Sequence, residues 1–220
     1  MGRFSVSRLS VLIPGRWRRL YGIRFDKSAI QTVDTLSEFI QTRSAYVAQT
    51  SLYGYLKTRM GTRFRQIFED DKFLPSINQA KWRTYGACLS DLTVFAAALT
   101  GAGNRLEENQ ISDLARGCFE TAVRQTFDGA EAGEVRAGII ESFAARVKRT
   151  HWPNAAIGEG AFTSSAEVLL ESAPIADELK ERDVEIVTNS IRFRWRDVRD
   201  QLRKRIDRDA ICAEWLAVER

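Results

Sequence analysis

The residues best suited to chemistry in this chain are one histidine, three cysteines and scattered serines and carboxylates. His151 lies in the loop-like stretch HWPN, and the sequence holds no second histidine. A di-iron site in a helical bundle needs two Glu-x-x-His motifs, so this sequence excludes that site. A single loop histidine beside a tryptophan is more often packed or capping than catalytic, and we expect His151 to follow that pattern.

Nucleophilic and nucleotide-binding motifs are also missing from the sequence. A serine hydrolase of the α/β type needs Gly-x-Ser-x-Gly on a strand-to-helix turn. Gly129 and Gly133 have that spacing, but Glu131 stands between them. There is no Walker A lysine motif and no Gly-x-Gly-x-x-Gly, and the glycine pairs in GAG (101–103) and GEG (158–160) indicate turns. The sequence therefore predicts no catalytic residues, no metal ligands and no cofactor.

The cysteines, Cys88, Cys118 and Cys212, point to a reducing compartment. Their number is odd and they form no CxxC motif, which argues against a disulfide framework or a structural zinc site. Each has apolar neighbours of helical spacing, so we expect buried, reduced thiols. No signal peptide is evident, and the longest apolar run, VFAAAL (94–99), is too short to cross a bilayer. The sequence predicts a cytoplasmic protein, with peripheral association at a membrane as the further expectation.

The front of the chain carries the clearest charge signal. Residues 1–25 hold six arginines and no acid, whereas residues 26–220 hold 27 basic and 29 acidic residues. Aromatic and aliphatic groups among arginines are typical of a segment that docks on anionic lipid or an acidic partner. The alternative is that Trp17, Leu20 and Ile23 pack on the body while the arginines stay in water. The candidate membrane- or partner-binding residues are Arg3, Arg8, Arg16, Trp17, Arg18, Arg19 and Arg24.

The rest of the chain reads as helices joined by short turns. Apolar residues recur at steps of 3 and 4, and sustained alternation of period two is missing apart from FSVS in the arm. We expect Asp26 to cap a first helix that includes Ile30 and stops at Gly61. The sequence predicts helices at about 27–60, 63–70, 76–100, 107–127, 131–149, 164–172 and 209–218, a loop at 150–163, a helix start at Pro174, and a long helix before residue 206.

The long helix before residue 206 has the most regular pattern. Its predicted buried stripe consists of Val184, Val187, Ile191, Trp195, Val198, Leu202 and Ile206, all separated by steps of 3 or 4. Arg192, Arg196, Arg199 and Arg203 share another face, which suggests a nucleic-acid or headgroup surface. Acidic residues are interleaved with them, as in Arg196–Asp200 and Arg203–Asp207. A solvated, self-paired face is therefore favoured over nucleic-acid binding.

A tyrosine-rich segment, SLYGYLKTRMGTRF (51–64), ends the first predicted helix. Tyr53 and Tyr55 cannot both share the buried face of Leu52 and Leu56. Either some aromatic surface is left for a partner, or both are ordinary tyrosines at the edge of the core; the second reading is favoured.

The segments SEFIQTRSAYVAQTSLYGYLKTRMGTRFRQIFEDD (37–71) and AKWRTYGACLSDLTVF (80–95) resemble a family of uncharacterised bacterial helical proteins of similar length. Many of its members are labelled "esterase". The resemblance covers most of residues 27–150 and implies a helical bacterial protein that hydrolyses carboxylic esters. It brings no defined catalytic set with it.

Together these patterns predict an all-α protein, with six to eight helices around a single core in residues 26–220 and a basic arm in residues 1–25. The favoured function is a non-enzymatic interaction protein, such as an adaptor, assembly factor or regulator, with a protein partner or an anionic membrane surface. A hydrolase acting on small esters is the alternative. Nucleic-acid binding ranks third, because the body outside the arm is slightly acidic.

Overall fold

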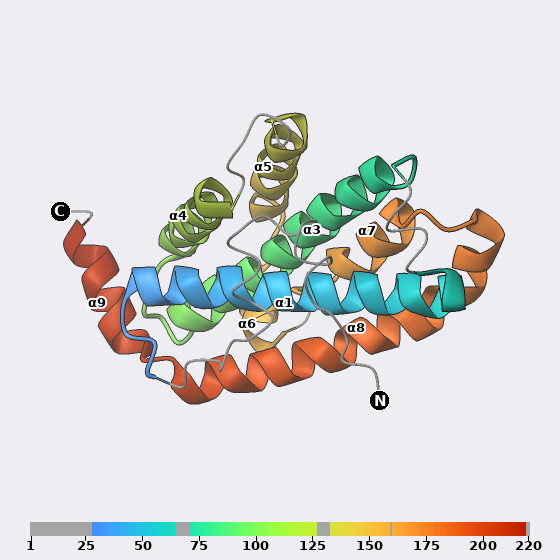
Figure 1. Ribbon diagram of the computed structural model, residues 1–220. Helices are drawn as coiled ribbons and strands as arrows, with labels where there is room; N and C mark the ends of the chain where they lie inside the picture. Colours follow the sequence, from blue (N-terminus) through green and yellow to red (C-terminus); the bar gives the residue numbers. More distant parts are fainter. Residues whose placement is uncertain (1–27, 65–70, 127–132, 159, 219–220) are drawn as a thin grey trace.

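The structure, a computed structural model, describes residues 28–64, 71–126, 133–158 and 160–218. These residues form eight α-helices and one 3-10 helix, with no strand among them, which confirms the predicted all-α fold (Figure 1). The elements are α1 (Val33–Met60), η2 (Gly61–Arg63), α3 (Leu74–Gly101), α4 (Glu108–Thr126), α5 (Gly133–Val147), α6 (Trp152–Ile157), α7 (Ser164–Ser172), α8 (Asp177–Arg205) and α9 (Arg208–Val218).

Helix α3 lies at the centre of the molecule. It packs against α1, α4, α5, α6, α7 and α9, and every residue from 89 to 98 is buried. The sequence LSDLTVFAAAL, apolar nearly all round, predicts such a helix, and the structure confirms it. Helices α1 and α8 run side by side across the molecule, while α4 and α5 lie on the opposite side of α1 from α8 (Figure 1).

The first helix begins six residues later than predicted. Thr32 is its N-cap, and the Thr32 side chain accepts a hydrogen bond from the backbone N–H of Thr35. Ile30 is not helical: its N–H donates to the Arg205 carbonyl at 2.9 Å, and its carbonyl accepts from the Asp207 N–H at 2.8 Å. The predicted placement of Ile30 in the helical stripe is thus wrong, because its backbone is tied to the end of α8. The predicted stop at Gly61 is confirmed.

The stretch 150–163, predicted as a loop, contains a short helix. His151 caps α6, Pro153 lies in its first turn, and Gly158 ends it with a φ of 98°. Proline is well suited to the first turn of a helix, because its missing N–H has no helical partner there. The proline and glycine that indicated a loop are the two end signals of one short helix.

Most of the predicted stripe on α8 is buried, but not all of it. Val187, Ile191, Trp195, Val198 and Leu202 are buried, as predicted. Val184 is 51% exposed, and Ile206 is half-buried where the helix ends. The preceding residue, Asp183, contacts Arg59 in the last turn of α1. Val184 is therefore at the level where α1 ends, and it is exposed because α1 does not extend far enough to cover it.

The arginines of α8 differ from the predicted self-paired face. The guanidinium groups of Arg199 and Arg203 lie over the Phe95 ring, 5.4 Å from its centroid in both cases. Among the described residues, neither Arg196–Asp200 nor Arg203–Asp207 forms an ion pair. Part of this basic face therefore stacks on an aromatic ring of α3 instead of pairing with acids of α8, although Arg203 is still exposed.

Other predictions concern the cysteines, the membrane and the arm. Cys88, Cys118 and Cys212 are buried free thiols, as expected. Within the described residues, no helix combines the length and apolar character needed to cross a bilayer. Some of the predictions fall outside the described residues. They concern Asp26, residues 65–70, Phe127 and the seven arm residues proposed for binding, Arg3, Arg8, Arg16, Trp17, Arg18, Arg19 and Arg24.

Candidate functional site

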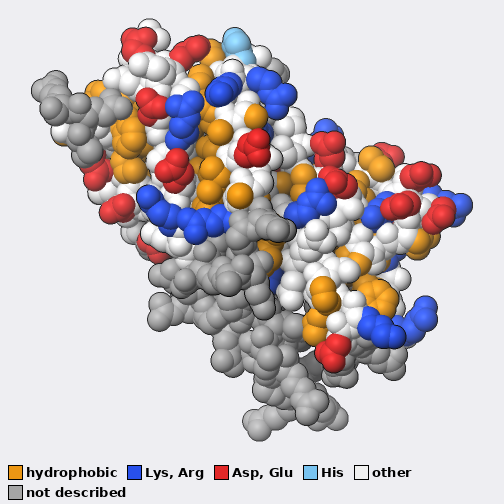
Figure 2. All heavy atoms as spheres, turned by 90° about the horizontal axis from the view of Figure 1, so that it is seen from above, with side chains coloured by type: hydrophobic (Ala, Val, Ile, Leu, Met, Phe, Trp, Pro, Cys, Tyr) orange, Lys and Arg blue, Asp and Glu red, His pale blue; other side chains and the backbone are white. Residues whose placement is uncertain are grey.

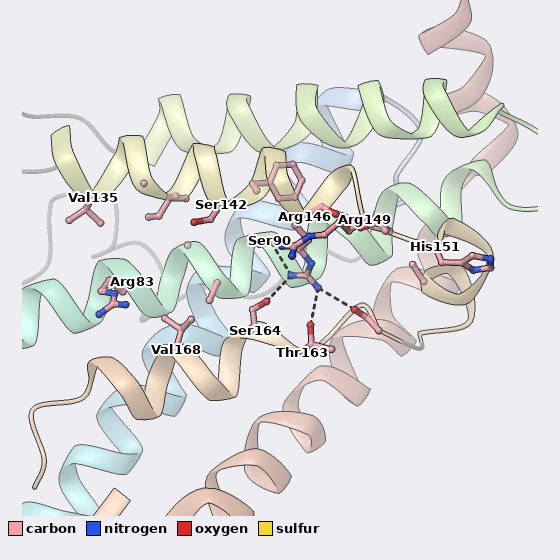
Figure 3. A pocket seen from close by; sticks show the side chains of 18 of the residues that line it. Arg83, Ser90, Val135, Ser142, Arg146, Arg149, His151, Thr163, Ser164 and Val168 are labelled. Atoms are coloured by element: carbon pink, nitrogen blue, oxygen red, sulfur yellow. Dashed lines mark hydrogen bonds between the residues drawn. The ribbon is translucent and has the colours of Figure 1, made fainter. Parts of the chain in front are cut away.

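A groove of about 1070 Å³ runs between α5 and α7, over the first half of α3 (Figure 3). Val135 and Arg83 lie toward one end, and His151 lies at the other. Figure 2 looks down on the side of the molecule where α4 and α5 lie; basic and acidic side chains alternate over this face, and the histidine lies at its edge. A concave surface lined by both apolar and polar groups is a common form of binding site.

The floor of the groove is made of small residues of α3, which let α5 come close. Gly86, Ala87 and Ser90 line the groove from α3. A Cβ atom at Gly86 would lie 2.5 Å from Cδ1 of Ile139 on α5, closer than real carbon atoms approach. The glycine therefore leaves room for the Ile139 side chain, and a larger residue would force that side chain or α5 to move.

Arg146 of α5 occupies the middle of the groove, where several groups hold its guanidinium (Figure 3). Its Nη1 donates to Asp91 Oδ1 at 2.6 Å and to Ser90 Oγ at 2.9 Å. Its Nη2 donates to the Ala161 carbonyl at 2.6 Å. The Asp91 side chain is fully buried, so the charge of Arg146 is matched inside the protein. We infer that Arg146 shapes the groove and offers little free charge to a ligand.

Asp91 also fixes the start of α7. Its two carboxylate oxygens accept hydrogen bonds from the backbone N–H groups of Ser164, at 3.2 Å, and Ser165, at 2.9 Å. The Ser165 hydroxyl in turn accepts a hydrogen bond from Nε1 of Trp195 on α8, at 3.0 Å. A carboxylate at a helix N-terminus satisfies N–H groups that have no partner within the helix. One buried acid thus joins α3, α5, α7 and, through Ser165, α8.

Sequence reasoning missed this pair. The signal for Asp91 is present: a carboxylate inside a helix that is otherwise apolar must find a cation or several donors. Its partner lies 55 residues away, and the sequence offers 33 lysines and arginines to choose from. The pattern could therefore predict a buried ion pair at Asp91, but not its partner.

The groove lining is basic in its described part, where it includes arginines but no Asp or Glu. Arg83 is paired at the exposed edge, where its Nη2 lies 2.7 Å from Glu171 Oε1. Arg149 is exposed, and its Nε donates to the Ala145 carbonyl at 3.3 Å. Within the described residues its guanidinium has no carboxylate partner, so Arg149 is the groove cation most available to an anionic ligand.

His151, at one end of the groove, has the capping role expected of it. Its Nδ1 accepts a hydrogen bond from the Asn154 N–H at 3.3 Å. When the ring is neutral, its proton then resides on Nε2. In this tautomer Nε2 can donate a hydrogen bond to a ligand but cannot take a proton from a serine. Hydroxyl groups of Ser142, Thr150 and Thr163 line the groove as further polar groups.

A second buried charge lies between α1 and α8. The Tyr55 hydroxyl donates to Asp183 Oδ2 at 2.8 Å, and Arg59 forms an ion pair with the same carboxylate. Burial raises the pKa of Tyr55, an effect that Arg59 partly offsets. Tyr55 belongs to the core and Tyr53 packs against its edge, in agreement with the favoured reading of the two tyrosines. This cluster holds α1 to α8 and lies apart from the groove lining.

No cluster of three or more His, Cys, Asp or Glu residues in the described parts of the chain could hold a metal ion. Comparison of the chain with protein-family models, curated proteins and solved structures gave no match. The groove and its charges are therefore what the functional proposal rests on.

Proposed function

We propose that the protein is a non-enzymatic interaction protein whose groove between α5 and α7 binds an acidic, partly apolar segment of a protein partner. The observation that carries the proposal is the lining of the groove: among the described residues it contains three arginines and no Asp or Glu, and Arg149 is the one of the three without a carboxylate partner there. Complementary potentials favour a partner of opposite charge and disfavour one of like charge. A role as adaptor, assembly factor or regulator fits such a surface.

The two ends of the groove differ in a way that favours an amphipathic segment. Val135 and Val168 supply apolar contacts toward one end, where Arg83 also lies, while Arg149 and His151 lie toward the other. The volume of about 1070 Å³ lies at the upper limit of the roughly 300–1000 Å³ usual for small-molecule pockets. An open groove of this size suits a helical or extended peptide better than an enclosed small ligand.

The experiment compares Arg149→Glu with Lys148→Glu in binding to a set of fluorescently labelled acidic amphipathic peptides. Binding is measured in solution by fluorescence anisotropy. Arg149 lines the groove, whereas Lys148 is also exposed but is not among the lining residues. We expect Arg149→Glu to weaken binding about tenfold or more, because it introduces like-charge repulsion, and Lys148→Glu to leave it unchanged. Equal effects of the two variants, or no acidic peptide bound by the parent, would contradict the proposal.

We also propose that the arm of residues 1–25 holds the protein at the cytoplasmic face of an anionic membrane. The support is its composition, six arginines without an acid beside Trp17 and Leu20. Each arginine near such a surface contributes about 1 kcal/mol, which suits weak and reversible binding. Co-sedimentation with anionic vesicles should fall as salt rises from about 0.05 to 0.3 M and vanish on deletion of residues 1–25. If the full-length protein does not bind the vesicles at low salt, the membrane proposal is refuted. Binding to DNA or RNA instead would favour the nucleic-acid-binding function.

A hydrolase acting on small esters is the second candidate, because Ser142 and His151 line the same groove. The capping bond to Nδ1 of His151 argues against this residue as a general base toward a serine. If the protein is not a hydrolase, His151→Ala and Ser142→Ala should leave any turnover of a chromogenic short-chain ester unchanged. A loss of about a hundredfold in either variant, with folding intact, would establish the enzyme instead.

A further inference from the structure

The outer face of α8 carries apolar side chains that are exposed to solvent and that the other described helices do not cover. Leu179, Ile186 and Phe193 are 37%, 69% and 65% exposed, and they follow one another at steps of seven. That spacing places them along one line of the helix, as in the seam of a helix pair. With 29 residues, α8 is about 43 Å long and lies at one edge of the molecule (Figure 1).

Four charges on one flank of this line are sorted along the helix, although exposed charges of the other sign, Arg182 in the first half and Asp197 and Asp200 in the second, lie elsewhere on α8. Glu181 and Glu185 lie in its first half, Arg192 and Arg196 lie in its second half, and all four are exposed. Their steps of 4, 7 and 4 put them on one flank. Within a single α8 each like-charged pair at i,i+4 is repulsive. Among the described residues, none of the four forms an ion pair.

A second α8 laid antiparallel on the first would match both features. In a symmetric antiparallel pair, a residue of one helix faces a residue of the other helix when their two residue numbers add up to one fixed value. Glu181 and Arg196 have the same sum as Glu185 and Arg192, so one two-fold axis near residues 188–189 brings both acids opposite both arginines. Ile186 and Phe193 have nearly the same sum, so each Ile186 would meet the Phe193 of the other copy. A parallel pair would instead place acid beside acid.

We propose that the outer face of α8 is a self-complementary surface on which a second copy of this chain docks, with the two helices antiparallel. An isologous contact of this kind closes into a dimer with two-fold symmetry. This inference is independent of the groove, since none of these four charged residues or of the three apolar ones lines it.

The first experiment measures the mass of the full chain by sedimentation equilibrium over a range of concentrations, for the parent, Ile186→Asp and Ile157→Asp. Ile157, on α6, is the matched control, because its 63% exposure is close to that of Ile186. We expect the measured mass of the parent to approach twice the 25.0 kDa of one chain as its concentration rises. Ile186→Asp should raise the dissociation constant by about 100-fold, as for a central interface side chain, and Ile157→Asp should not. A monomeric parent, or a dimer unaffected by Ile186→Asp, would overturn the proposal.

The second experiment tests the orientation with two charge-reversed proteins. Glu181→Lys/Glu185→Lys and Arg192→Glu/Arg196→Glu should each be monomeric where the parent is dimeric, because like charges then face each other. An equimolar mixture should recover a one-to-one dimer, since all facing charges are then opposite. Both proteins should show the parent's helical circular dichroism. Failure of the mixture to associate, with both proteins folded, would rule out the antiparallel arrangement.

The arm of residues 1–25 is a competing occupant, since its arginines could meet the acids of the first half of α8. A full chain that is monomeric, and that becomes dimeric only on deletion of residues 1–25, would assign the face to the arm and overturn the dimer. A dimer that persists after the deletion and is still broken by Ile186→Asp supports the second copy.

Discussion

Asp91 on α3 and Arg146 on α5 form an ion pair with 2.6 Å between Oδ1 and Nη1, in which the carboxylate is fully buried. The same two side chains hold the start of α7 and the chain segment that precedes it. The walls of the candidate groove therefore depend on one pair of charges inside the protein.

Replacing Asp91 should be among the most destabilising single changes in the chain. Asp91→Ala leaves the largely buried Arg146 without its counter-charge and the first N–H groups of α7 without acceptors. Breaking a buried pair in this way typically costs about 3–5 kcal/mol. Chemical denaturation of the parent and the variant measures the loss. Glu171→Ala is the control: it breaks the exposed pair with Arg83, which is worth about 1 kcal/mol or less.

Gly86→Ala tests the close contact between α3 and α5. The new Cβ would lie 2.5 Å from Cδ1 of Ile139, so the Ile139 side chain or α5 must shift, at a cost of about 1–3 kcal/mol. Ile139→Ala should cost less in the Gly86→Ala background than in the parent, because the clash is then relieved. Gly54→Ala is the control, since nothing lies within 4 Å of its Cβ position in α1. It should stabilise the protein by about 0.5–1 kcal/mol through helix propensity.

Trp195→Ala should destabilise the protein by about 3–5 kcal/mol, because it removes a buried aromatic side chain and its hydrogen bond to Ser165. Val184→Ala, in the same sequence pattern but half exposed, should cost only a few tenths of a kcal/mol. Thermal melting of both variants compares them directly. Similar losses would mean that the packing of α8 differs from that described.

The contrast between Trp195 and Val184 shows how far sequence periodicity reaches. A stripe at steps of 3 and 4 predicts the face that a helix can bury, and it identifies Trp195 correctly. It does not tell where the neighbouring helix ends, and α1 ends beside Val184. In the same way, the composition of α3 predicts a central helix, but the partner of Asp91 depends on how distant segments fold together. The groove could not be predicted, because its lining comes from four helices and the loops between them.

The buried thiols make alkaline stability a test of the core. Burial raises the pKa of Cys118 from 9.0 to about 11, and it also raises the pKa values of Cys88 and Tyr85. Between pH 9 and 11 the folded protein thus keeps protons that the unfolded chain loses, so stability must fall as pH rises through this window. A shift from 9.0 to about 11 corresponds to at most about 3 kcal/mol for Cys118.

We therefore expect the free energy of unfolding to be nearly constant from pH 7 to 8.5 and to decrease steeply above pH 9. Cys118→Ala should lower stability at pH 7, because it removes buried volume, but should make the alkaline decrease shallower. Urea denaturation across this pH range, under reducing conditions, measures both slopes. Equal slopes in parent and variant would show that Cys118 does not hold its proton more tightly in the folded state. Rapid alkylation of Cys118 by iodoacetamide at pH 8, without denaturant, would contradict its burial directly, since the thiolate is the reactive form.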